Sequence, residues 1–142
     1  VGQERARGGA DAMSGWEAIA LEELRDLINQ SLAQSSAESR RIFGLIQIPP
    51  EKWALPPWGD QGGGFWVIAV LGQSAIWYND IEEGFNCSPF TRLGILDQYA
   101  CDQLELHHWL FRLNHYLATG KGFPGEGLGA PEAISQLQAR AD

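Results

Sequence analysis

The amino-acid sequence predicts an α+β fold in which a four-stranded, mostly antiparallel sheet is flanked by helices. Segments with apolar residues at helical spacing stand near both ends of the chain, and segments rich in β-branched and aromatic residues lie between them. Strands that are grouped between helices, without regular alternation, are typical of this fold class. We therefore expect a single domain over residues 13–120.

The first predicted helix covers residues 16–36, because its leucines recur at spacings of three and four. Ser14 with Glu17 has the spacing of a capping box, which places the start of the helix near Trp16. The apolar stripe consists of Leu21, Leu24, Leu27, Ile28 and Leu32.

Four strands are expected after this helix. The segment RIFGLIQI, residues 41–48, predicts a strand that stops at Pro49-Pro50, because proline cannot donate to a ladder. Residues 49–64 then form a long loop. A central strand over 65–72 is apolar on both alternating faces, and a turn at 72–74 leads into a return strand at 75–79. The last short strand is expected around 94–96.

The second long helix is predicted to begin at Asp102, which has Glu105 three residues later, and to end at Gly120. Its apolar stripe consists of Leu106, Trp109, Leu110, Leu113, Tyr116 and Leu117. Residues 121–142 indicate a glycine-rich linker and a short C-terminal helix, and residues 1–12 are interpreted as disordered or as an upstream extension.

The composition excludes several classes of partner. A net charge of −8 disfavours nucleic acid, and no apolar run is long enough to cross a membrane. No secretory signal is visible, so we expect a cytoplasmic protein in which Cys87 and Cys101 stay reduced.

Three carboxylates, Asp80, Glu82 and Glu83, follow the aromatic residues Trp77 and Tyr78. They do not match a calcium loop, which needs alternating acidic ligands and a closing glutamate. No histidine or lysine stands nearby in sequence to complete an acid–base pair. Three interpretations stay open: a solvated turn, a docking surface for a basic partner, or a catalytic acid cluster.

Other candidate chemistry is weak. His108 and His115 lie seven residues apart on the outer face of the last helix, too far apart for one zinc ion, and His107 is expected to be packed or hydrogen-bonded. Ser88 and the two cysteines lack a nucleophile motif. We therefore expect no catalytic residues, no metal and no cofactor.

The aromatic residues around the hairpin complete a candidate partner-binding surface. Trp77 and Tyr78 point to opposite faces of their strand, so one of them is expected to face away from the main core. Tryptophan and tyrosine are enriched at recognition hot spots. The candidate residues are Trp53, Trp58, Trp77, Tyr78, Asp80, Glu82, Glu83 and Phe85.

The segments GFWVIAVLG, AIWYNDIEEGFN and YACDQLEL resemble those of small bacterial proteins of the SMI1/KNR4-like group, also called SUKH. The resemblance covers about residues 14–118 and includes a Trp-bearing helix near each end. It implies a non-catalytic binder of the immunity-protein type, whose acidic surface covers a toxin or another partner.

The leading hypothesis is thus a non-catalytic protein-binding domain that recognises a basic protein, such as a toxin domain. The alternative is a small hydrolase or ligand-binding protein with a pocket between the 49–64 loop and the 65–79 hairpin. A third hypothesis is a homodimer subunit without a small ligand.

Overall fold

A computed structural model describes residues 17–121 of the chain. Helix α1 (Leu21–Ala33) and helix α2 (Ala37–Ile46) precede a sheet of four strands. These strands are β1 (Gln47–Trp53), β2 (Phe65–Leu71), β3 (Ser74–Asn79) and β4 (Gly84–Pro89), and helix α3 (Leu106–Thr119) follows them. The sheet is an antiparallel meander in the order β1-β2-β3-β4, which confirms the predicted fold class.

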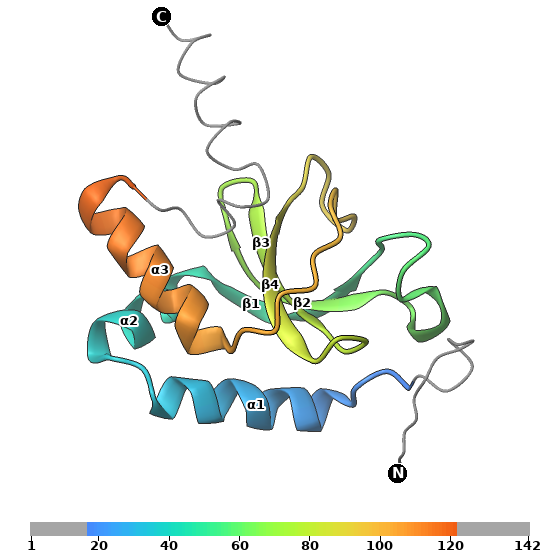
Figure 1. Cartoon of the computed structure of the whole chain (residues 1–142), viewed down its shortest axis with the longest axis horizontal. Helices are drawn as coiled ribbons and strands as arrows, with labels where there is room; N and C mark the ends of the chain where they lie inside the picture. The colour runs from blue at the N-terminus through green and yellow to red at the C-terminus, as the bar shows by residue number, and fades with distance from the viewer. Residues whose placement is uncertain (1–16, 122–142) are drawn as a thin grey trace, which may run out of the picture.

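The helices cover one face of the sheet and the loops cover the other. Figure 1 shows α1 along the lower edge, with α2 and α3 beside the sheet on the left. On the helix-covered face, Leu24 and Trp109 are buried against Ile76 and Phe85. On the loop-covered face, Trp53 and Leu96 are packed in a second core cluster.

The predicted strand over residues 41–48 is wrong, because most of it belongs to α2. Ser36 caps this helix by accepting a hydrogen bond from the backbone N–H of Ser39 (3.0 Å). The buried residues Ile42 and Phe43 and the half-buried Ile46 lie on one helical face. The same apolar residues also alternate partly like a strand, so the pattern by itself was ambiguous.

The two prolines do not stop a strand, since Pro49 and Pro50 lie inside β1. This strand is at the edge of the sheet, and its pairing with β2 is irregular between Gln47 and Glu51. An irregular edge strand tolerates the missing donors of proline. The long loop is therefore shorter than expected and begins after Trp53.

The fourth strand is β4 and not the segment around residues 94–96, which forms only isolated bridges. Strand β4 carries polar residues, and its Asn86 and Ser88 are buried. Ser88 accepts a hydrogen bond from the indole N–H of Trp77 (2.9 Å), and Asn86 accepts one from the backbone N–H of Asp102 (2.8 Å). Internal partners for polar side chains therefore allow this strand to be buried.

The central strand β2 and its hairpin with β3 are as predicted, except for the faces of two residues. The register shifts between Val67 and Ala69, which indicates a β-bulge at Ile68. Ala69 consequently joins the helix-covered face, and Val70 packs against the loop-covered face.

Both long helices begin later than predicted. Helix α1 begins at Leu21, and Ala20 at its N-cap makes no side-chain bond. Glu105, rather than Asp102, caps α3 in a reciprocal capping box with His108. Gly120 ends α3 in the left-handed conformation (φ 75°), as expected. The predictions for Ser14, for residues 1–12 and for the C-terminal linker and helix lie outside the described residues.

Candidate functional site

Four of the eight candidate partner-binding residues belong to the core and form no surface. Trp77 has an exposed fraction of 0% and Tyr78 of 8%, although they face opposite sides of the sheet. The expectation that one of them faces outward is wrong, because helices cover one face and loops cover the other. The four buried candidates are Trp53, Trp77, Tyr78 and Phe85.

Asp80 also points inward. Its carboxylate accepts a hydrogen bond from the backbone N–H of Ile19 (2.7 Å), in the segment just before α1. Burial raises the pKa of Asp80 to about 6, although that hydrogen bond and the charge of Lys52 act in the opposite direction. This residue therefore attaches the N-terminal side of α1 to the sheet and does not offer its charge to a partner.

The turn between β3 and β4 is organised by Asn79, whose side chain is completely buried. Its oxygen accepts hydrogen bonds from the backbone N–H groups of Ile81 and Glu82, and its amide donates to the hydroxyl of Tyr99 (3.0 Å) and to the carbonyl of Ala100 (2.9 Å). The acidic segment is thus a rigid turn with an internal frame.

Three of the eight candidates reach the surface: Trp58, Glu82 and Glu83. Trp58 is 41% exposed and stacks on Tyr99, with ring centroids 4.2 Å apart. Burial raises the pKa of Tyr99, and the charge of Glu82 raises it further, so the stacked pair and this carboxylate lie within electrostatic range.

A further acidic residue, Asp102, is exposed beside the turn. The side-chain amide of Gln103 donates to the backbone carbonyl of Glu82 (2.9 Å), which holds the segment before α3 against the turn. We call Trp58, Tyr99, Glu82, Glu83 and Asp102 the acidic–aromatic edge. Sequence analysis missed Tyr99 because no local pattern pairs it with Trp58.

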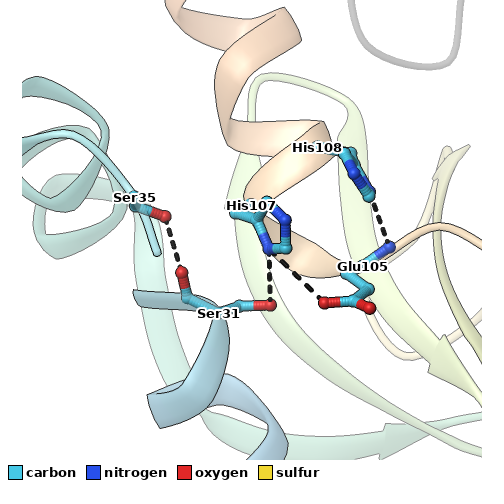
Figure 2. Close-up of polar contacts among 5 residues, drawn as sticks. All are labelled: Ser31, Ser35, Glu105, His107 and His108. Atoms are coloured by element: carbon cyan, nitrogen blue, oxygen red, sulfur yellow. Dashed lines mark hydrogen bonds and ion pairs between the residues drawn. The ribbon is translucent and has the colours of Figure 1, made fainter. Parts of the chain in front are cut away.

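A second polar cluster lies between the end of α1 and the start of α3 (Figure 2). The Nδ1 atom of His107 lies 3.2 Å from the hydroxyl of Ser31 and 3.6 Å from a carboxylate oxygen of Glu105. The Nδ1 atom of His108 accepts the backbone N–H of Glu105 (3.1 Å). The predicted hydrogen-bonded role of His107 is confirmed.

This serine, histidine and glutamate do not form a catalytic triad. In a triad the hydroxyl contacts Nε2, while the carboxylate contacts Nδ1 on the other side of the ring. Here both oxygens face Nδ1 of His107. Ser31 is also buried, so its hydroxyl is inaccessible to a substrate.

A cleft of about 460 Å³ lies beside this cluster, between the α1–α2 connection and α3. Another cleft of about 500 Å³ lies between α1 and the start of β1. In the alternative hypothesis a pocket lies between residues 49–64 and the 65–79 hairpin; Pro49, Pro50 and Ile68 from these segments line the second cleft, whereas Trp53, Leu55 and Trp77 are packed in the core.

The two thiols differ in environment. Cys87 is buried, which raises its pKa to about 12, whereas Cys101 is exposed. Within residues 17–121, no group of three or more His, Cys, Asp or Glu side chains is placed to hold a metal ion. In the same range, no helix is both long and apolar enough to span a bilayer.

Comparison with known proteins identifies no relative of this chain: no family model, no curated protein and no solved structure matches it.

Proposed function

We propose that this chain is a non-catalytic protein-binding domain that recognises a basic protein through the acidic–aromatic edge. The toxin-neutralising type of binder, which the resemblance to SMI1/KNR4-like proteins implies, is the form of this function that we favour. The hairpin aromatics have no part in it, because they are buried. Trp58, which stacks on Tyr99, takes their place.

The observation that carries the proposal is a half-exposed tryptophan stacked on a tyrosine that lies within electrostatic range of the Glu82 carboxylate. Trp58 stacks on Tyr99, the hydroxyl of Tyr99 accepts from Asn79, and Asn79 holds the turn that carries Glu82. An anchored aromatic ring loses little conformational entropy on binding, and this favours recognition.

The charge pattern supports a basic partner. Glu82, Glu83 and Asp102 reach the surface and place three carboxylates on the β3–β4 turn and the segment beside it. The field of such carboxylates accelerates association with a positively charged protein and makes the association sensitive to salt.

The test first asks whether a gene beside this one encodes a basic protein, and then measures the dissociation constant of that protein for this chain by calorimetry at low and high salt. The variant Glu82→Gln/Glu83→Gln/Asp102→Asn is expected to weaken binding about tenfold or more and to flatten the salt dependence. Trp58→Ala is expected to weaken binding to a similar extent. The control, Glu17→Gln/Glu22→Gln/Asp26→Asn, removes the same charge from exposed positions in and before α1.

The control is expected to bind like the unmodified chain. Equal losses in the two triple variants would show that net charge alone matters and that the edge is not the binding surface. Unchanged binding by the edge variant, or no binding of the basic protein to the unmodified chain, would contradict the proposal.

A further inference from the structure

The cleft beside α3 has a chemical character opposite to that of the acidic–aromatic edge. In a chain with a net charge of −8, none of the described residues that line this cleft is Asp or Glu. Cationic, imidazole, hydroxyl and aromatic groups are found there instead. They include Ser36, Ser39, His107, His108, Phe111 and Arg112.

Both histidine rings use Nδ1 for contacts within the chain. Because the backbone N–H of Glu105 donates to Nδ1 of His108, this nitrogen is an acceptor and the ring proton is on Nε2. Nδ1 of His107 faces Ser31 and Glu105, which leaves Nε2 on the opposite side of the ring. Nε2 of His108 is therefore a hydrogen-bond donor that takes no part in the contact with Glu105.

Two further positive groups come from different helices. The guanidinium of Arg112 lies over the ring of Trp109, 5.1 Å from its centroid, and this contact limits its movement. Helix α2 begins at the cleft with Ser36 as its N-cap. The N-terminus of a helix carries a partial positive charge and attracts anions.

The cleft also has an apolar wall. Phe111 is 69% exposed, and Leu104 is half-buried beside it. An exposed phenylalanine next to an arginine is typical of a protein-recognition surface, since aromatic residues and arginine are enriched at interfaces. The wall offers contact to an apolar side chain while the positive groups attract an adjacent carboxylate.

We propose that this cleft binds an acidic peptide segment of a partner protein, in which a carboxylate side chain stands next to an apolar one. Charge complementarity selects the carboxylate, and Phe111 with Leu104 packs against the apolar neighbour. The site is independent of the acidic–aromatic edge, because it has the opposite charge preference and uses no residue of that edge.

The test is an NMR titration of the full chain with acetyl-Leu-Glu-Leu-amide, with acetyl-Leu-Gln-Leu-amide as the neutral control. The acidic peptide is expected to cause saturable shifts at Ser36, Ser39, His108 and Phe111. A hydrogen bond to a charged group corresponds to roughly a tenfold change in affinity, so the neutral peptide is expected to bind about tenfold more weakly.

Two exposed residues of the cleft provide variants that retain the fold. Arg112→Gln and Phe111→Ala are each expected to weaken binding about fivefold or more. Each variant has a matched control outside the cleft. Arg92→Gln removes an exposed arginine, and Leu117→Ala removes an exposed apolar residue of α3. Both controls are expected to bind like the unmodified chain.

Three outcomes would overturn the proposal: equal binding of both peptides, shifts centred away from the cleft, or no saturable shift. A separate titration uses acetate alone. If acetate saturates the same residues at the concentration at which the acidic peptide does, the cleft is a site for free anions and the peptide proposal is wrong.

Discussion

The two ends of α1 are attached to the rest of the molecule by polar contacts of different kinds. Before the helix, the peptide of Ile19 donates to the buried carboxylate of Asp80, and its carbonyl accepts from the indole N–H of Trp66 (3.2 Å). Near its other end, the hydroxyl of Ser31 meets His107 beside an open cleft. The first attachment is enclosed by the protein and the second borders a cleft.

This difference shows how a polar cluster in the sequence can mislead. Asp80 belongs to the most acidic segment of the chain, yet it is used internally. His107 and His108 were not expected to form a site, yet they line a cleft of about 460 Å³. Polar groups whose partners are internal have little capacity left for ligands, whereas those beside a cleft retain some.

The frame of the β3–β4 turn, which positions Asp80, offers the largest expected effect on stability. Asn79→Ala removes four hydrogen bonds at a completely buried site. We expect the free energy of unfolding to fall by about 2–4 kcal/mol in urea titrations. A loss below about 0.5 kcal/mol would show that water or a rearranged turn replaces the frame.

Asp80 itself predicts a pH dependence. Its pKa rises from 3.8 to about 6 on folding, so the native state binds more protons than the unfolded state between about pH 4 and pH 6. The contribution of Asp80 to stability is therefore greatest below this window, falls by about 2–3 kcal/mol as pH rises through it, and changes no further above it. The measurement is urea unfolding across this range.

The variant Asp80→Asn is expected to lose this contribution, so that the difference between its stability and that of the unmodified chain changes with pH. Glu83→Gln is the matched control, because Glu83 is an exposed carboxylate of the same turn. If the curves of Asp80→Asn and the unmodified chain run parallel from pH 4 to pH 7, Asp80 is not the cause.

The contact beside the cleft is expected to have the smallest effect. Ser31→Ala removes one hydrogen bond to His107, and we expect a loss of about 1 kcal/mol. Ser35→Ala is the control, because the hydroxyl of Ser35, in the connection after α1, bonds only to the nearby backbone carbonyl of Ser31 (2.9 Å), and its effect is expected within about 0.5 kcal/mol. A Ser31→Ala effect as large as that of Asn79→Ala would remove the distinction between the two regions.

Part of the fold followed directly from local pattern. The stripe of α1 around Leu24 and Ile28, the β2–β3 hairpin and the end of α3 at Gly120 were predicted correctly. Each depends on periodicity or turn chemistry within a few residues. The candidate site was predicted only in part, since Glu82, Glu83 and Trp58 reach the surface and the other five residues do not.

The remainder was decided by contacts between distant residues. Strand β4 is a strand because Asn86 and Ser88 find partners in the segment before α3 and in β3, and nothing in its own sequence indicates this. The contact of Ser31 with His107 joins residues 76 positions apart. By itself, the sequence determined the helices and strands whose apolar residues repeat with a clear period. Tertiary packing decided which polar groups are enclosed and which remain available, because burial depends on what covers each face of the sheet.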